Sequence, residues 1–349
     1  MSDKLFFASD YMEGCHPAIL ERLTQTNYEK TAGYGTDGYS EAARQKIRML
    51  CNAPAAEIQF LVGGTQVNET VITSLLRPYQ GVLAAETGHI AVHEAGAIEA
   101  GGHKVLPLKQ EYGKISGDAV REYCRAFYAD ANHDHMVMPG MVYISQPTEY
   151  GTLYSLNELR DLHDACRQFG LYLYADGARL AYALAAEEND VTLLDLAEQC
   201  DVFYIGGTKC GALFGEAVVM ADPGLIPHFF TIIKQRGALV AKGRITGLQF
   251  DTLFTDNLYE EAGRHALAEA EKIKAALKKY GYQFFFETPT NQIFIVLDNE
   301  TLKTFGQKCE YSYWEPFDEN HTVIRLATSW ATDGADTEAL IQLLETLSH

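Results

Sequence analysis

Short apolar runs alternate with stretches of helical length from about residue 55 to residue 250, and this alternation restricts the chain to few folds. It is typical of a mostly parallel sheet that helices cover on both faces. Between two runs, residues 156–169 carry apolar side chains at helical spacing and end at Gly170, a common position for glycine after a helix. We therefore predict an α/β fold whose large sheet has seven strands, at 58–62, 82–85, 104–108, 141–144, 171–175, 202–205 and 216–220.

The pattern changes near residue 255. Residues 258–280 form a charged, Ala-rich stretch that Gly281 closes, and we expect a long helix there that connects two domains. Beyond it we expect strands at 283–286, 292–297 and 322–327 and a final helix at 333–347. We predict a large domain over 1–255, which includes an N-terminal arm over 1–30, and a small C-terminal α+β domain over 256–349.

Composition excludes several classes of function. The formal net charge of -19 would repel nucleic-acid phosphates and anionic lipid headgroups, so we expect neither kind of partner. We find no run of about 18 apolar residues and no apolar core of a signal peptide near the N-terminus. The seven cysteines form no Cys-x-x-Cys pair and suggest neither a zinc ribbon nor a disulfide framework. We expect a cytoplasmic protein.

Asp176 ends one of the apolar strands and is followed by a glycine. In open α/β sheets, ligands bind at the carboxyl ends of the strands. A carboxylate in that position can keep a pyridine nitrogen protonated, which makes pyridoxal phosphate a strong electron sink. The alternative is a cap of the following helix, and the strand-then-Asp pattern alone favours this alternative.

Lys209 follows the next predicted strand, within Gly206-Gly-Thr-Lys209-Cys-Gly211. A lysine that forms a Schiff base needs a partly desolvated pocket that keeps its amine neutral, and glycines let the backbone approach a ring closely. Taken alone, Lys209 is more often a solvated loop lysine.

Two further segments fit the same cofactor. Gly63, Gly64 and Thr65 precede a predicted helix, whose N-terminus favours a phosphate, although strand-to-helix turns are often glycine-rich. The segment has neither the Walker nor the dinucleotide-binding pattern. His89 could stack on a pyridine ring. With His93 it could also pair as a metal ligand, but a third ligand of matching spacing is missing, so we expect no metal.

Together these segments resemble the threonine aldolase and β-eliminating lyase family, within the fold-type I, aspartate-aminotransferase-like enzymes that use pyridoxal phosphate. The resemblance spans essentially the whole chain. The motifs that carry it, in order, are Ser9-Asp10, Tyr34-Gly-Thr-Asp37, Gly64-Thr-Gln-x-Asn68, His89-x4-Glu94-Ala-Gly, Asp176-Gly-Ala-Arg179, Thr208-Lys209-x-Gly211 and Ile324-Arg325-Leu326.

The resemblance implies a role for each residue. Lys209 would bind the cofactor covalently, Asp176 its ring nitrogen and His89 its ring face. The remaining cofactor contacts would come from Gly64, Thr65, Gln66, Arg179, Thr208 and Arg244. Ser9, Tyr34, Arg179 and Arg325 would bind the substrate, the arginines through its carboxylate. The family builds its site between subunits, so we expect a homo-oligomer, a dimer or tetramer, in which Tyr34 and the 242–244 segment reach a neighbouring protomer.

The implied reaction is the cleavage of L-threonine, or of another β-hydroxy-α-amino acid, to glycine and an aldehyde. The chain departs from the family at one point: where the family often has Asn-Thr-His-Asn-Gly, it has Gln146-Pro-Thr-Glu149-Tyr-Gly151. Glu149 thus replaces an imidazole. A glutamate in a dry pocket can act as a base, so we hypothesise that Glu149 polarises the β-hydroxyl, although it could equally be structural.

Three alternatives remain open from the sequence. The first is another reaction of the same cofactor, in a β-eliminating lyase, aminotransferase or racemase, because pyridoxal phosphate allows any bond at Cα to break. The second is a non-catalytic protein that retains the fold, against which Lys209, Asp176 and both arginines argue. A nicotinamide dehydrogenase would also need a doubly wound sheet, but the dinucleotide fingerprint is missing.

Overall fold

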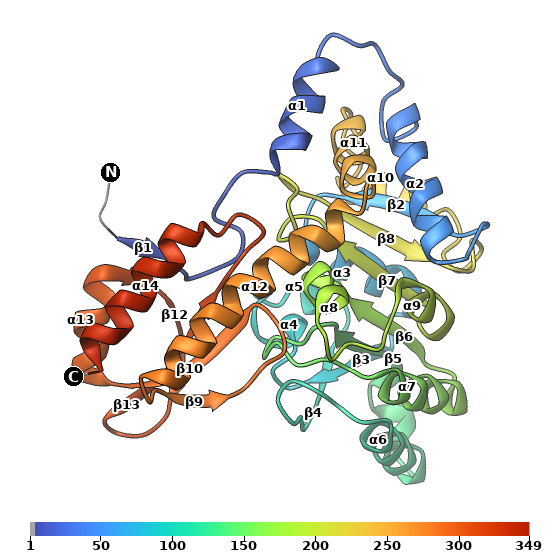
Figure 1. Ribbon diagram of the computed structural model, residues 1–349. Helices are drawn as coiled ribbons and strands as arrows, with labels where there is room; N and C mark the ends of the chain where they lie inside the picture. The colour runs from blue at the N-terminus through green and yellow to red at the C-terminus, as the bar shows by residue number, and fades with distance from the viewer. Residues whose placement is uncertain (1–3, 349) are drawn as a thin grey trace.

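The computed structural model describes residues 4–348, so residues 1–3 and 349, at the outer ends of the two predicted domains, lie outside the described residues. The described chain folds into a large lobe around a seven-stranded sheet and a smaller C-terminal lobe, with the long helix α12 (Leu258–Lys279) running between them (Figure 1). The predicted boundary after residue 255 falls between α12 and the preceding helix, α11 (Arg244–Leu253).

The large sheet has the strand order β2-β8-β7-β6-β5-β3-β4. Strand β8 is antiparallel to both of its neighbours, and the other adjacent pairs are parallel. All seven predicted strands are present, each within three residues of its expected ends. Their bounds are β2 (Glu57–Leu61), β3 (Gln80–Ala85), β4 (Val105–Leu108), β5 (Met138–Ser145), β6 (Tyr172–Asp176), β7 (Val202–Gly206) and β8 (Glu216–Met220).

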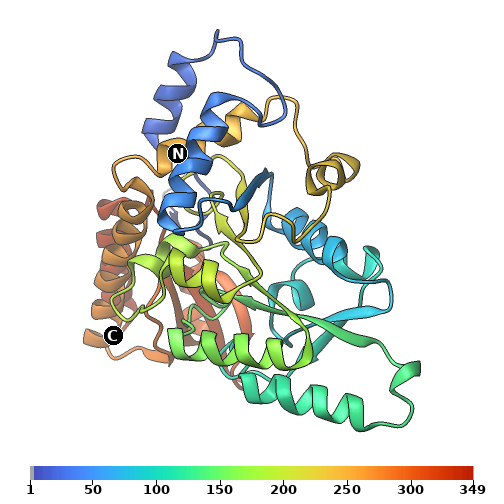
Figure 2. The same ribbon diagram turned by 90° about the vertical axis from the view of Figure 1, so that its right-hand side faces the viewer.

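Helices cover both faces of this sheet, as the near-continuous apolar strands require. One face packs against α1 (Pro17–Gln25), α2 (Gly38–Leu50), α6 (Gly117–Ala129), α7 (Leu156–Phe169), α8 (Leu180–Ala185), α9 (Leu193–Gln199), α11 and α12. The other packs against α3 (Gly64–Leu75), α4 (His89–Val92), α5 (Ala97–Ala100) and α10 (Phe229–Gln235). A 3-10 turn, His133–His135, precedes β5. In Figure 2, α1 and the loop that joins it to α2, in blue, lie at the top of the view.

The C-terminal lobe contains a four-stranded antiparallel sheet in the order β12-β13-β10-β9. The strands are β9 (Gln283–Phe286), β10 (Gln292–Asp298), β12 (Ser312–Pro316) and β13 (His321–Ala327), with the helices α13 (Asn299–Lys308) and α14 (Gly334–Leu347). Strand β1 (Leu5–Phe6) pairs in parallel with β11 (Cys309–Glu310), so the beginning of the predicted N-terminal arm lies against this lobe.

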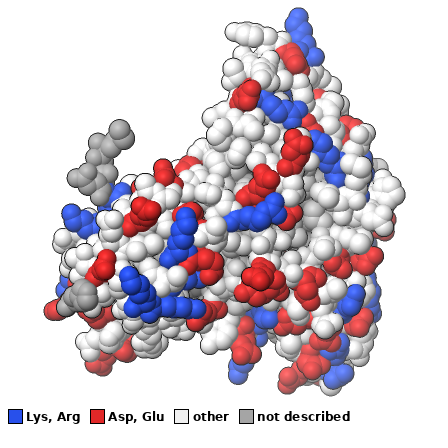
Figure 3. Space-filling model, viewed as in Figure 1, with Lys and Arg blue, Asp and Glu red and all other residues white. Residues whose placement is uncertain are grey.

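The cysteines, the surface charges and the possible metal ligands show no specialised arrangement among the described residues. The seven cysteines are buried free thiols. None of the described helices combines the length and the apolar character needed to cross a bilayer. On the face shown in Figure 3, acidic and basic side chains are interspersed. Within residues 4–348, no three His, Cys, Asp or Glu side chains gather as a metal-binding group.

Candidate active site

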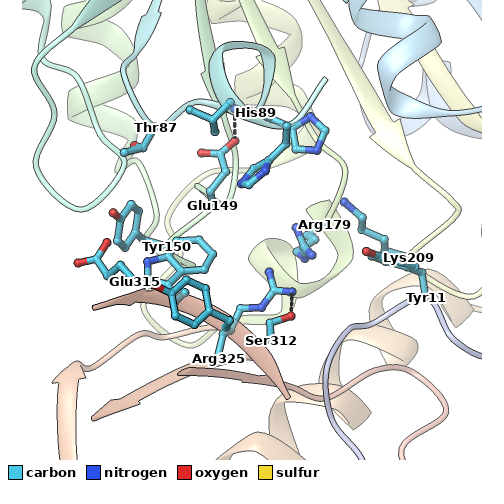
Figure 4. A pocket seen from close by; sticks show the side chains of 14 residues that line it. Tyr11, Thr87, His89, Glu149, Tyr150, Arg179, Lys209, Ser312, Glu315 and Arg325 are labelled. Carbon is cyan, nitrogen blue, oxygen red and sulfur yellow. Dashed lines mark hydrogen bonds between the residues drawn. The ribbon is translucent and has the colours of Figure 1, made fainter. Parts of the chain in front are cut away.

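Two adjoining cavities of about 490 and 360 Å³ lie where the carboxyl ends of the large sheet's strands face the C-terminal lobe. Six residues line both cavities and join them into one site: Tyr11, His89, His93, Glu149, Arg179 and Lys209. In Figure 4 the large lobe contributes His89 and Glu149 to one wall, and the C-terminal lobe contributes Arg325 to the opposite wall. Residues from the two ends of the chain thus meet in one pocket.

Asp176 lies at the end of β6, buried in the second cavity. Its carboxylate accepts hydrogen bonds from the hydroxyls of Tyr143 (2.6 Å) and Tyr204 (2.5 Å), from Asn68 Nδ2 (3.1 Å) and from the Ala178 amide (2.9 Å). Burial raises the pKa of this carboxyl, but the charge of His89 and the two tyrosine hydroxyls outweigh burial, so the pKa lies below its ordinary value. Asp176 is therefore an aligned, ionised carboxylate.

Lys209 lies in the loop that follows β7 and lines both cavities. Burial lowers the pKa of its amine, and the positive charge of Arg179 lowers it further. Its Nζ lies 5.8 Å from the centre of the Tyr11 ring. A neutral amine in a partly dry pocket is the form that attacks a carbonyl carbon. The turn after β6 approaches β7, the strand before the Lys209 loop, so closely that a Cβ at Gly177 would lie 2.0 Å from the Tyr204 carbonyl oxygen.

The residues predicted to form a phosphate cup lie together at the second cavity. Gly63, Gly64 and Thr65 line the second cavity at the N-terminus of α3, and Thr208 faces them from the loop after β7. Helix α3 has twelve residues, so its N-terminal amides favour an anion there. The sequence reasoning missed one member of this cup, Glu216, whose carboxylate accepts from the Thr208 hydroxyl (2.7 Å) and the Gly207 amide (3.0 Å). Burial raises the pKa of Glu216 to about 8.

His89 begins α4 and lines both cavities. Its Nδ1 lies 2.7 Å from Glu94 Oε1, and that same oxygen accepts a hydrogen bond from Asn68 Nδ2 (2.6 Å). Asn68 in turn accepts from the hydroxyl of Tyr174 (2.6 Å). A single buried network therefore orients both the histidine ring and the Asp176 carboxylate. His93 lies beside His89, with ring centres 5.7 Å apart.

Two arginines line the first cavity with different partners. Arg179 donates from Nε and Nη2 to the buried carboxylate of Asp10, at 2.6 and 3.0 Å. Arg325 donates to Gln292, to Ser312 and to the Ala8 carbonyl, while its buried Nε has no partner in the described part of the chain. Burial and the charge of Arg179 lower the pKa of Arg325 to about 10. Two neighbouring guanidinium groups, one with an unused donor, suit a carboxylate ligand.

Glu149 lies on the loop after β5, buried and facing the cavity. Its Oε1 accepts from the backbone amide of His89 (2.9 Å) and from the hydroxyl of Ser145 (2.7 Å). Its Oε2 makes no hydrogen bond to the described residues. Burial raises the pKa of Glu149, against the opposing effect of the Ser145 hydrogen bond. One oxygen thus positions the group and the other is available to a ligand.

Four predicted residues lie outside the lining of this single-chain pocket. Ser9 is buried beside Asp10, and Gln66 Oε1 accepts from the Val62 amide (3.2 Å), which closes the turn before α3. Tyr34 is exposed, with Lys234 Nζ 4.4 Å from its ring centre, and Arg244 donates to the Thr26 carbonyl (3.0 Å). Their roles in the site stay predictions.

The sequence reasoning also missed Tyr143, Tyr204 and Trp314. Both tyrosines lie within predicted strands, where they read as core residues. Trp314 lies in the unpredicted strand β12 and lines the first cavity, with the Arg325 guanidinium carbon 5.8 Å from its ring centre. Strands β5 and β7 lie on either side of β6, and this strand order brings Tyr143 and Tyr204 to Asp176. Knowledge of that order would have been needed to predict the role of the two tyrosines.

The described residues fit pyridoxal phosphate. Asp176 offers an ionised carboxylate for a pyridine nitrogen, the pKa of the Lys209 amine is lowered by burial, and the turn before α3 offers backbone amides. Thr87 also lines the cavity, and its buried Oγ1 has no partner between residues 4 and 348. Lys209 would carry the cofactor and Asp176 would hold its ring nitrogen.

Comparisons with known proteins agree with this geometry. The family described as beta-eliminating lyase matches residues 7–300. A low specificity L-threonine aldolase from Pseudomonas sp. (strain NCIMB 10558) is 29% identical over 305 residues, covering 86% of this chain and 87% of that protein. A Leishmania major threonine aldolase structure has a TM-score of 0.95 and 39% identity, covering 99% of this chain and 100% of that chain.

An aspartate aminotransferase double mutant from Thermus thermophilus superimposes with a TM-score of 0.72 at 13% identity, over 99% of this chain and 92% of that chain. At this identity the likeness concerns the fold alone, and it confirms the predicted fold-type I architecture. The match along residues 7–300 confirms the predicted family and its cofactor. The chain is a member of the beta-eliminating lyase family, whose enzymes use pyridoxal phosphate.

Proposed function

We propose that this chain is a pyridoxal-phosphate-dependent aldehyde-lyase that cleaves β-hydroxy-α-amino acids, L-threonine among them, to glycine and an aldehyde. The observation that carries the proposal is one cavity lined by Arg179, Arg325 and Lys209 together with Glu149 and His89. An amino acid of this class requires cations for its carboxylate and a proton acceptor for its β-hydroxyl. Similarity to threonine aldolases along most of the chain supports the same reaction.

The cofactor and the protein divide the work. Bound pyridoxal phosphate supplies an electron sink for a bond that breaks at Cα. Lys209 would hold it, Asp176 would keep its ring nitrogen protonated, and Gly64, Thr65 and Thr208 would bind its phosphate. The network from Asn68 through Glu94 to His89 keeps the histidine ring in a fixed orientation.

The two arginines orient the substrate. Arg325 lines the cavity, and its buried Nε has no partner among the described residues, while two hydrogen bonds to Asp10 hold Arg179 in place. A carboxylate bound between them leaves little freedom for rotation about Cα, and this fixes which bond at Cα can break. Ser9, beside Asp10, is proposed as a further carboxylate contact.

Glu149 is proposed as the base. Its Oε1 is anchored to the His89 amide and Ser145, so Oε2 is the oxygen that can accept the β-hydroxyl proton. As that proton leaves, the C–O bond becomes the aldehyde carbonyl and the Cα–Cβ bond breaks. A proton returned to Cα gives glycine. The raised pKa of Glu149 brings its basicity closer to that of the group it deprotonates.

We also propose a cytoplasmic homo-oligomer, a dimer or tetramer, in which Tyr34 and Arg244 serve a neighbouring protomer's site. Tyr34 is 42% exposed and has a positive φ of 59°. One buried nitrogen of Arg244, Nη1, has no partner within the described chain. Both features are consistent with contacts supplied by a second subunit.

The direct test incubates the cofactor-loaded protein with a panel of amino acids and identifies the products. We expect acetaldehyde and glycine from L-threonine and no keto acid, together with a visible absorption band of the lysine-bound cofactor that is lost in Lys209→Ala. Pyruvate would instead indicate β-elimination, and racemised or transaminated amino acids would indicate another reaction. A protein that stays colourless with pyridoxal phosphate would refute the proposal.

A second experiment tests the base. Because a positioned general base contributes about a hundredfold or more, Glu149→Gln should lower kcat for L-threonine by at least that factor. Glu269→Gln is the matched control, since Glu269 is a buried glutamate on α12. Full retro-aldol activity in Glu149→Gln would show that Glu149 only supports the His89 loop.

A further inference from the structure

Glu216 is a buried carboxylate inside the proposed phosphate cup, and the mechanism above does not use it. It is the first residue of β8, where a functional residue is unexpected. Because β8 runs antiparallel between β2 and β7, its beginning pairs with Leu61 and Gly206, the last residues of those strands. Glu216 therefore lies between the two loops that form the cup.

The hydrogen bonds show what this carboxylate does there. Its two oxygens accept the Thr208 hydroxyl (2.7 Å) and the Gly207 amide (3.0 Å). The Thr208 oxygen itself accepts from the Gly215 amide (3.1 Å). A hydroxyl has a single proton to donate, and that of Thr208 is given to Glu216. While Glu216 is ionised, it uses two donors that a phosphate would need.

Electrostatics add to this competition. A phosphate next to an ionised, buried Glu216 would place two anions together, with Asp176 as a third charge nearby. Within residues 4–348, the largest charge effects on Glu216 come from one cation, Lys209, and one anion, Asp176. Glu216 also interacts with the neutral Tyr174, Tyr204, Tyr259 and Cys210. Burial already disfavours the ionised form.

We propose that Glu216 takes up a proton when the phosphate group of the cofactor binds, and that this releases the Thr208 hydroxyl to the phosphate. The proton comes from solvent and goes to the carboxylate, which becomes a carboxylic acid with one O–H to donate. Thr208 then turns its own proton from Glu216 to the phosphate and keeps the bond from Gly215. Glu216 thus changes from a competitor of the phosphate into a hydrogen-bond donor. This inference rests on the proposed position of the cofactor.

The test uses pyridoxine 5′-phosphate, which has no aldehyde and cannot react with Lys209. Its binding to the 349-residue chain, freed of cofactor, is measured calorimetrically from pH 7 to 9.5 in pairs of buffers that differ in ionisation heat. We expect proton uptake on binding that approaches one proton at the alkaline end. By linkage, the affinity should then fall by up to about tenfold per pH unit. Pyridoxine without phosphate should take up no proton through Glu216.

Glu216→Gln is the decisive variant, because its amide imitates the protonated acid without titrating. We expect this variant to take up about one proton fewer and to hold pyridoxine 5′-phosphate more tightly than the wild type at pH 9.5. Lys209 also loses its proton at alkaline pH in both proteins. The informative quantity is therefore the difference in proton uptake between the wild type and Glu216→Gln. Glu269→Gln controls for a buried glutamate outside the cup and should match the wild type.

Equal proton uptake in wild type and Glu216→Gln would overturn the inference. Weaker binding in Glu216→Gln at every pH would also overturn it, since the carboxylate would then only shape the loop. If Glu216→Gln is unstable, the wild type itself still gives a decisive comparison: proton uptake with pyridoxine 5′-phosphate that does not exceed the uptake with pyridoxine would overturn the inference. If pyridoxal phosphate gives the absorption band of the lysine-bound cofactor but Glu216 takes up no proton on phosphate binding, only this inference fails. If no band forms, the proposed function fails first.

Discussion

Replacing Tyr143 by phenylalanine removes one of the four hydrogen bonds that the Asp176 carboxylate accepts. Both residues are buried, so water cannot easily replace the lost hydroxyl. A hydrogen bond to a charged group contributes about 1.5–3 kcal/mol. Its loss should therefore raise the pKa of Asp176, because the ionised carboxylate loses that stabilisation.

The sign of the pH dependence follows from the folded-state pKa. The pKa of Asp176 is lower in the folded protein than in the unfolded chain, so ionised Asp176 stabilises the fold. This stabilisation is complete at pH values above the pKa of Asp176 in the unfolded chain. It is lost as the pH falls through the pKa of Asp176 in the folded protein. Tyr143→Phe should therefore be less stable than the wild type by about 1.5–3 kcal/mol at pH 7. The difference should shrink as pH falls through the Asp176 pKa of the variant toward the lower pKa of the wild type.

Urea unfolding of the cofactor-free chain at several pH values measures this difference. Tyr174→Phe is the matched control, because the Tyr174 hydroxyl donates to the neutral Asn68 side chain and not to Asp176. Its destabilisation should not depend on pH. A pH-independent difference in Tyr143→Phe, or the same pH dependence in both variants, would refute the reasoning. With the carboxylate less well aligned, kcat in Tyr143→Phe should also fall, by about tenfold for each 1.4 kcal/mol lost from the transition state.

Two further predictions concern residues around the pocket. Asp10→Asn should destabilise the fold by about 2 kcal/mol at pH 7, because the charge of Arg179 outweighs burial and lowers the pKa of Asp10 to about 2. The destabilisation should fade between about pH 4 and pH 2. A constant difference in unfolding free energy over that range would contradict this prediction. Gly177→Ala should lower the free energy of unfolding by about 3 kcal/mol and with it the melting temperature, because the new Cβ would lie 2.0 Å from the Tyr204 carbonyl oxygen. Gly38→Ala is the control, because its Cβ would meet open space. Equal melting temperatures of the two variants would contradict this prediction.

Much of the fold could be predicted from local pattern. Each strand of the large sheet is an apolar run between turns, and all seven were predicted. Strand β5 begins at Met138, three residues earlier than expected, because Pro139 and Gly140 disguise its start. Strand β12 was not predicted, because Ser312–Pro316 is a partly exposed edge strand that contains a glutamate and a proline.

The sequence by itself determined the groups that we propose for the chemistry: a carboxylate at a strand end, a lysine among glycines after the next strand, and a glycine-rich turn before a helix. Asp176, Lys209 and Gly64 occupy these positions because chain neighbours create them. Only the tertiary structure decided what surrounds them. The antiparallel direction of β8 brings Glu216 into the cup, and the register of β5 and β7 against β6 brings Tyr143 and Tyr204 to Asp176. These contacts depend on strand order and direction, which no local pattern of residues contains.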